Sequence, residues 1–90
     1  MKLSNKLTPS SQVIARDVGQ EIVLLDLASG TYFGLDPVGA RIWQLMRSGK
    51  TLDEVCDAMM EEYEVPRETL EQDVQALARQ LIEKQLAAAA

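Results

Sequence analysis

The chain has no histidine, one cysteine and only four aromatic residues. Histidine is the commonest general base near neutral pH and the commonest metal ligand, so catalysis or metal binding through an imidazole is excluded. The single cysteine, Cys56, can form neither an internal disulfide nor a zinc site by itself. A signal peptide and an apolar run near the ~20 residues of a membrane span are both missing. We therefore expect a soluble, cytoplasmic protein that does not insert into a membrane.

Positive charge is also scarce, with nine basic residues against 14 acidic ones and a net charge of −5. Nucleic-acid binding depends on clustered Lys and Arg that displace counterions from phosphates, so this composition argues against a nucleic-acid partner. Residues 46–90 hold ten acidic and five basic side chains, whereas residues 1–45 hold four of each. The acidic excess therefore lies wholly in the second half of the chain.

Neither the carboxylates nor the cysteine forms a recognisable reactive site. The acidic residues between 53 and 64 lack the alternating ligand spacing and central glycine of a calcium loop, and a solvated helix face explains them. Cys56 lies among apolar residues at helical spacing, and its acidic neighbours do not favour a reactive thiolate, so we interpret it as a core residue. We expect no catalytic residue, no metal and no cofactor, and hence a protein that is not an enzyme.

A chain of 90 residues is expected to form one domain, at a size where folding buries only about 60–65% of the surface and stability is narrow. Residues 1–11 show no hydrophobic period and are expected to form a loosely ordered arm. Residues 12–86 hold all the patterned segments and form the single domain. Residues 87–90 are all alanine and are expected to form a disordered tail.

Residues 12–35 contain three short segments with the pattern of strands. The first covers residues 12–16 or 12–18. The second, EIVLLDL at residues 21–27, is apolar on both faces, which is typical of a central strand. Residues 28–30 have the length of a three-residue hairpin loop that ends in a left-handed glycine, and Thr31–Leu35 is rich in strand-favouring side chains. The pattern predicts a three-stranded antiparallel meander, which needs a covering layer of helices to be stable.

The rest of the chain has helical periodicity. Asp36 as N-cap and Pro37 at the first position begin a helix that runs to about residue 47. Thr51 and Glu54 form a capping box for a second helix. A third helix runs from residue 66 or 67 to about residue 85. The stripes expected to face inward are Val38, Ile42, Leu45 and Met46; Leu52, Val55, Cys56, Met59 and Tyr63; and Leu70, Val74, Leu77 and Leu81, with Ala78 and Ile82 as further candidates.

The outer edge of Thr31–Leu35 is unprotected. Natural sheets protect a free edge with Lys, Pro or inward charge, and TYFGL contains none of these. The edge can be covered by the protein's own third helix, by a second copy of the chain, or by a foreign peptide that adds as a fourth strand. Gly34 either permits the close approach of another backbone or marks a bulge. Tyr32 and Phe33 point to opposite faces of the strand, so at most one of them faces the core.

The segment YFGLDPVGARIW, preceded by LLDLASG and followed by SGKTLDEV, resembles the PqqD-like family, the small recognition domains of ribosomally made, post-translationally modified peptides. The similarity extends over residues 13–86. It implies an α+β fold in which a three-stranded antiparallel meander is followed by a winged-helix-like bundle of three helices. It also implies an adaptor that binds the leader segment of a precursor peptide as an antiparallel strand beside the third strand, in a groove walled by the third helix.

The resemblance further implies a set of site residues and partners. The peptide-binding residues carried over by position are Thr31, Tyr32, Phe33, Gly34, Leu35, Asp73, Val74, Leu77, Gln80 and Leu81. The implied partners are the precursor peptide and its modifying enzyme, either a radical SAM enzyme or a leader peptidase. The LASGTYFGLD wording is more similar to the lasso-peptide group than to the pyrroloquinoline quinone group.

Two alternatives remain open from the sequence. The chain could be a winged-helix DNA-binding regulator, although its Glu-rich EEYEVPRE segment would then face phosphates unfavourably. It could also be a homodimer that pairs the edges of the third strand. We expect a monomer or a weak homodimer.

Overall fold

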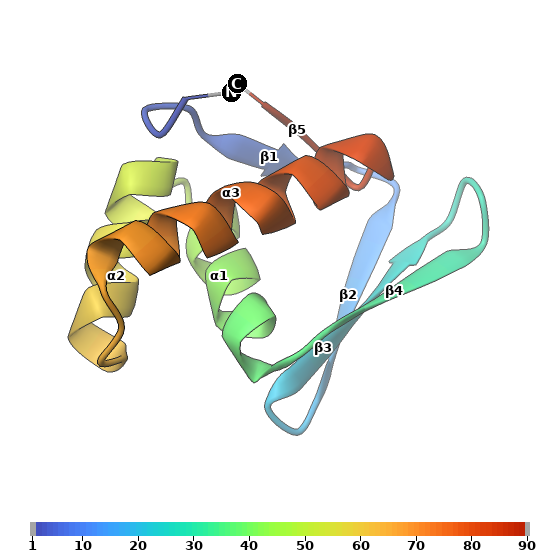
Figure 1. Ribbon diagram of the computed structural model, residues 1–90. Helices are drawn as coiled ribbons and strands as arrows, with labels where there is room; N and C mark the ends of the chain where they lie inside the picture. Colours follow the sequence, from blue (N-terminus) through green and yellow to red (C-terminus); the bar gives the residue numbers. More distant parts are fainter. Residues whose placement is uncertain (1, 90) are drawn as a thin grey trace.

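The computed structural model describes residues 2–89, so Met1 of the predicted arm and Ala90 of the predicted tail lie outside the described residues. The elements are, in order, β1 (Leu7–Pro9), β2 (Val13–Val18), β3 (Glu21–Asp26), β4 (Thr31–Leu35), α1 (Pro37–Arg47), α2 (Leu52–Glu62), α3 (Arg67–Glu83) and β5 (Ala87–Ala89). Figure 1 shows β2, β3 and β4 as a twisted sheet to one side of the helices, with α3 crossing from α2 towards the sheet. The fold is α+β, as the sequence predicts.

β3 is the central strand of the β2-β3-β4 sheet, which confirms the predicted meander. β3 ends at Asp26, however, so the loop to β4 contains four residues, 27–30, instead of the predicted three. The Asp26 carboxylate accepts hydrogen bonds from the Ala28 N–H at 3.1 Å and from the Ser29 hydroxyl at 2.8 Å. These bonds begin the turn one residue early, and Gly30 completes it with φ +73°, a conformation that costs glycine little.

The two faces of the sheet differ in burial. Ile22, Leu24 and Leu35 face the helices and are 3% exposed or less. Phe33 is directly opposite Leu24 in the register and is half-buried on the same face. Tyr32 is 69% exposed, because adjacent residues of a strand point to opposite faces. Of the two neighbouring aromatic residues, only Phe33 therefore faces the helical layer.

Both predicted helix starts are confirmed by their hydrogen bonds. The Asp36 carboxylate accepts the Gly39 N–H at 2.7 Å and caps α1. The Thr51 hydroxyl accepts the Glu54 N–H at 3.2 Å, while the Glu54 carboxylate accepts the Thr51 N–H at 2.8 Å. This is the reciprocal capping box of α2.

α3 ends at Glu83, two residues earlier than predicted. Gln85 has φ +60°, which breaks the helical path, and the Leu86 N–H then donates to the Leu81 carbonyl at 2.8 Å. The chain turn buries Leu86, which is only 2% exposed. Because this reversal ends α3 beside the sheet, the last turn of the helix lies near β4.

The core contains most of the predicted helical stripes. The buried members are Ile42, Leu45, Met46, Leu52, Val55, Cys56, Met59, Leu70, Val74, Ala78 and Leu81. Trp43, which lies beside the α1 stripe in the sequence, is also buried at 2% exposure. Val38 is 39% exposed, and Leu77, Tyr63 and Ile82 are half-buried, so they lie at the border of the core.

Ion pairs join the helices at the acidic end of the molecule. The Arg67 guanidinium on α3 binds Asp53 at 3.1 Å, Glu71 at 3.0 Å and also Asp57. Several of the acidic residues thus hold α2 and α3 together. Among residues 2–89, no three potential ligands from His, Cys, Asp and Glu gather into a metal-binding group. No helix in that range is long and apolar enough to cross a membrane.

The chain ends differ from the expected loose arm and disordered tail. β1 pairs antiparallel with β5, with Thr8 opposite Ala88. Leu7, at the start of β1, is 3% exposed and belongs to the core. Figure 1 shows β1 and β5 side by side at the top of the molecule. The sequence does not predict this pairing, because in a run of alanine all residues are alike and no alternation indicates a buried face or a register.

The segment before β1 is ordered by the start of α2. The N–H groups of Leu52 and Asp53 donate to the carbonyl oxygens of Asn5 and Leu3, each at 2.9 Å. The first N–H groups of a helix have no partner within the helix, so they are available to a passing backbone. Residues 3–9 of the predicted arm are therefore attached to the domain. The attachment consists largely of backbone hydrogen bonds, which the pattern of side chains does not predict.

Candidate functional site

A cleft of about 420 Å³ lies between β4, the first turns of α1 and the middle of α3. We call it the β4–α3 cleft. Its lining residues are Phe33, Gly34, Leu35, Asp36, Val38, Gly39, Ile42, Asp73, Ala76, Leu77 and Gln80. The volume falls within the range of about 300–1,000 Å³ that is typical of ligand sites. Six of the 11 lining residues have apolar side chains, and its charged members are two aspartates.

The α3 wall of the cleft is a single row of residues. Asp73, Ala76, Leu77 and Gln80 follow the i, i+3, i+4, i+7 spacing that places side chains on one helical face. Leu77 is half-buried and so presents part of its side chain to the cleft. Three of the five predicted α3 residues, Asp73, Leu77 and Gln80, therefore line the cleft.

Val74 and Leu81 do not line the cleft, although the sequence-based prediction included them. Both are 0% exposed and belong to the core. Consecutive residues of a helix are about 100° apart around its axis, so residues 74, 78 and 81 form a face next to the one that carries Asp73, Leu77 and Gln80. The predicted set combined residues from both faces, because helical spacing alone does not define the boundary between core and cleft.

The β4 wall contains three of the five predicted strand residues, Phe33, Gly34 and Leu35. Thr31 lies outside the cleft, in a second pocket farther along the strand. Tyr32 lines neither pocket and is exposed on the opposite sheet face. A Cβ atom placed on Gly34 would meet no atom within 4 Å, so open space adjoins this part of the strand.

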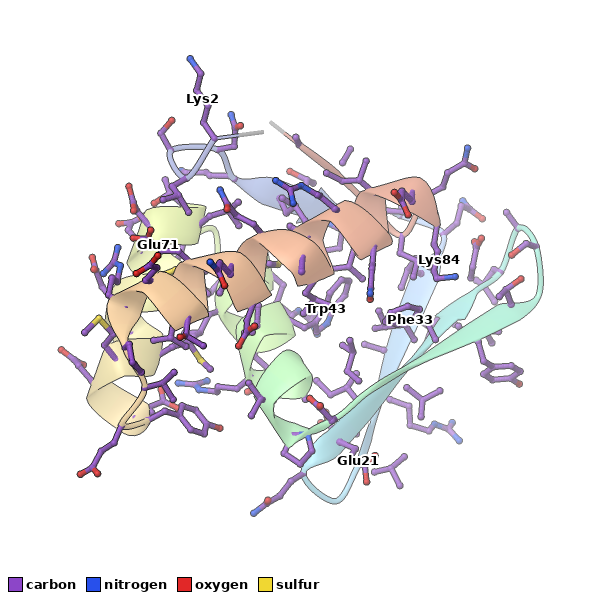
Figure 2. All side chains as sticks on the ribbon, viewed as in Figure 1. Lys2, Glu21, Phe33, Trp43, Glu71 and Lys84 are labelled. Atoms are coloured by element: carbon purple, nitrogen blue, oxygen red, sulfur yellow. The ribbon has the colours of Figure 1, made fainter. Side chains whose placement is uncertain are left out.

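The second pocket continues the hollow towards the start of β4. It measures about 280 Å³ and is lined by Asp26, Ser29, Thr31, Phe33, Glu83, Lys84, Gln85 and Leu86. Phe33 belongs to both pockets. Figure 2 shows the Phe33 side chain between β4 and the end of α3, with Lys84 reaching towards it. The Lys84 Nζ atom lies 5.6 Å from the centre of the Phe33 ring, a cation–π distance.

The outer edge of β4 is free along this hollow. Within residues 2–89, β4 pairs with β3 alone, and no backbone hydrogen bond joins it to any segment on its other side. Alternate residues of an edge strand direct their N–H and C=O groups away from the sheet. The structure therefore places a row of available backbone donors and acceptors beside the β4–α3 cleft.

Sequence reasoning missed the contribution of α1. Asp36 is the single residue between β4 and α1, so the first turns of α1 lie close to β4. They add Val38, Gly39 and Ile42 to the lining of the cleft. Val38 is 39% exposed. The sequence-based prediction assigned it to the core because the other members of its helical stripe face inward. Ala76 was missed as well, although its spacing of three residues from Asp73 is a signal that it shares the same face.

The chemistry of the cleft is that of a binding surface for an extended chain. It combines six apolar side chains, two carboxylates and the free edge of β4. The only thiol, that of Cys56, lies in the core at 0% exposure, and burial raises its pKa above the ordinary value. Cys56 therefore does not contribute a reactive thiolate to the cleft, which agrees with its interpretation as a core residue.

Comparison with known proteins identifies a family and two similar structures. The sequence model of the family described as Coenzyme PQQ synthesis protein D (PqqD) matches residues 21–87. TbiB1 in complex with the TbiA(beta) leader peptide is 45% identical, with a TM-score of 0.85, over 89% of this chain and 93% of that chain. Lasso peptide synthetase B1 complexed with the leader peptide is 30% identical, with a TM-score of 0.85, over 92% and 98%. The comparison with curated proteins gives no match.

Proposed function

Because this chain belongs to the PqqD family, we propose that it is an adaptor that binds the leader segment of a ribosomally made precursor peptide. The leader adds to the free edge of β4 as an antiparallel strand, and its side chains on one face enter the β4–α3 cleft. One observation carries the proposal: an unpaired strand edge adjoins a cleft with six apolar side chains, in a chain that is 45% identical to a protein whose structure was solved in complex with a leader peptide.

The proposed binding mode divides affinity and selectivity between backbone and side chains. Main-chain hydrogen bonds to β4 supply affinity for any extended peptide, and the cleft selects among side chains. Thr31 to Leu35 provide the strand, while Asp73, Leu77 and Gln80 provide the opposite wall. The exposed Tyr32 takes part through its backbone, since its side chain lies on the other sheet face.

The adaptor role requires no chemistry from this chain. A domain that holds the leader beside a modifying enzyme raises the local concentration of the substrate at that active site, up to the millimolar range for short connections. The two similar structures, TbiB1 and lasso peptide synthetase B1, favour a lasso-peptide pathway. We therefore propose a leader peptidase as the partner enzyme in preference to a radical SAM enzyme, and a site in the cytoplasm.

Amide chemical-shift mapping tests the binding mode directly. Titration with the TbiA(beta) leader peptide is expected to shift the amide signals of β4 and of α3 residues 73–80 together. A matched peptide that is N-methylated at alternate residues cannot form the main-chain bonds and is expected to bind much more weakly. Shifts confined to other elements, or equal binding of the methylated peptide, would refute strand addition at β4.

Two neighbouring aromatic residues provide a matched pair of variants. Phe33→Ala removes an aromatic side chain from the cleft and is expected to raise Kd about tenfold, or ~1.4 kcal/mol. Tyr32→Ala removes one from the opposite face of the same strand and should leave Kd nearly unchanged. Circular dichroism melts of both variants separate lost affinity from lost folding. Equal losses of affinity in two folded variants would contradict the cleft assignment.

The alternatives from the sequence give different results in the same experiments. A homodimer that pairs β4 edges sediments as a dimer, and peptide converts it to monomers only if both use the same edge. A DNA-binding regulator binds duplex DNA with an affinity that rises steeply at low salt. Binding to DNA but not to the leader peptide would overturn the proposed function.

A further inference from the structure

The lining of the β4–α3 cleft is negatively charged, and the Lys84 ammonium lies beside it, over the Phe33 ring in the second pocket. Two of the residues that line the cleft, Asp36 and Asp73, carry carboxylates, and none of the residues that line it is basic. One Asp36 oxygen is already engaged, because it accepts the Gly39 N–H as the cap of α1. A ligand in this cleft therefore contacts apolar side chains together with at least one carboxylate, that of Asp73, that neither caps a helix nor forms an ion pair within residues 2–89.

Asp73 differs in this respect from the acidic residues that precede it. It takes part in none of the ion pairs formed among residues 2–89. These join Arg41 to Glu62 and Arg67 to Asp53, Asp57 and Glu71. An exposed carboxylate on a helix is usually just solvated, but Asp73 stands in the row with Leu77 and Gln80 that walls the cleft. Anything that fills the cleft beside Leu77 therefore lies within reach of Asp73.

We propose that Asp73, with Asp36 beside the same cleft, is a specificity-determining residue that selects a leader with a Lys or Arg next to its apolar anchor. The apolar side chain lies between Phe33 and Leu77, and the basic side chain pairs with Asp73. This inference rests on the proposed function and adds the charge of the ligand to it. Charge complementarity carries it, because the lining of the cleft holds two carboxylates and no basic side chain.

The spacing of the two ligand residues follows from helix and strand geometry. Asp73 and Leu77 are four residues apart on α3, which corresponds to about 6 Å along the helix axis. Side chains on one face of an extended strand recur every second residue, at about 6.6 Å. The basic and the apolar residue of the peptide are therefore separated by one intervening residue.

The order of the two residues follows from the direction of α3. The cleft joins residues 73–80 of α3 to residues 33–36, whereas the second pocket joins residues 83–86 to Thr31 and Phe33. α3 therefore runs in the opposite direction to β4. A peptide that adds antiparallel to β4 runs in the same direction as α3 and passes Asp73 before Leu77. The selected pattern is a basic residue, any residue, then an apolar residue.

A charge-swap selection tests this pattern. Displayed random peptides of about ten residues, the upper range of natural strand lengths, are selected against the wild-type chain and against Asp73→Lys. Glu61→Lys, at an exposed α2 position outside the cleft, makes the same change of net charge as a control. Wild type and Glu61→Lys are expected to enrich the basic-x-apolar pattern, and Asp73→Lys an acidic residue in place of the basic one.

The outcomes separate this inference from the proposed function. If peptides with apolar anchors are enriched without any charge preference, or if the preference survives in Asp73→Lys, the inference is wrong and the proposed function stands. If no peptide is enriched, both are wrong. A preference for apolar-x-basic would show a parallel peptide and would overturn the assigned direction.

A double-mutant cycle measures the pair itself. For a selected peptide, replacement of the basic residue by Gln is expected to raise Kd about threefold to fivefold for the wild type, in the range of exposed ion pairs. The same replacement should have no further effect on Asp73→Asn, because the interaction is already lost. Additive effects of the two changes would refute a direct pair between them.

Discussion

Two leucines on α3, Leu77 and Leu81, allow the cleft to be separated from the core by experiment. Leu81 is 0% exposed, whereas Leu77 is half-buried and lines the cleft. We expect Leu81→Ala to lower the free energy of unfolding by about 2–5 kcal/mol, the cost of a fully buried leucine. Leu77→Ala should cost only about 1–2 kcal/mol, because part of its side chain is already in contact with water.

The expected effects on peptide binding run in the opposite order. Leu77→Ala removes apolar surface from the cleft and is expected to raise Kd roughly tenfold, or ~1.4 kcal/mol. Leu81→Ala should leave Kd within about twofold at temperatures where the variant is folded, since its side chain does not reach the cleft. Stability and affinity therefore respond to different residues of the same helix.

Urea unfolding followed by circular dichroism measures the first effect, and fluorescence anisotropy with labelled TbiA(beta) leader peptide measures the second. For a domain of this size, each 1 kcal/mol corresponds to about 4–8 °C in Tm, so a 2 kcal/mol loss in Leu81→Ala lowers Tm by roughly 8–16 °C. If Leu77→Ala binds peptide as well as the wild type, or destabilises as much as Leu81→Ala, the division of α3 into a core face and a cleft face is wrong.

Three further predictions concern the rest of the fold. The Cys56 thiol, buried and with a raised pKa, should resist iodoacetamide in the native protein and react rapidly in urea; fast native labelling would contradict its burial. The Thr51 N–H lowers the pKa of Glu54 and the Arg41 guanidinium lowers that of Glu62, both from 4.5. The stability that these lowered pKa values contribute is present above pH 4.5 and is lost as the pH falls through them. The free energy of unfolding should therefore fall less steeply with decreasing pH in Arg41→Met than in the wild type. An unchanged slope would refute this linkage. Leu7→Ala should cost about 2–5 kcal/mol in urea unfolding, because Leu7 is 3% exposed, whereas a loose arm would give no change.

Local chemistry made much of this fold predictable. Asp36 with Pro37 and Thr51 with Glu54 specify helix starts through hydrogen bonds that span only three residues. The apolar residues on both faces of EIVLLDL likewise predicted the central strand, and β3 does lie between β2 and β4. These features act over a few residues and leave their mark in the order of residue types.

The tertiary structure alone decided which residues form the cleft. Leu77 lies at the border between the core face and the exposed face of α3, so its role depends on the rotation of the helix relative to β4, which no periodicity within α3 records. The same holds for β1 and β5, since Leu7–Pro9 and Ala87–Ala89 pair across almost the whole chain. The sequence by itself determined the three strands of the meander, the three helices and the residues at which these helices begin. Long-range packing decided which helix face meets the free edge of β4, because that choice depends on contacts between segments that are distant in the chain.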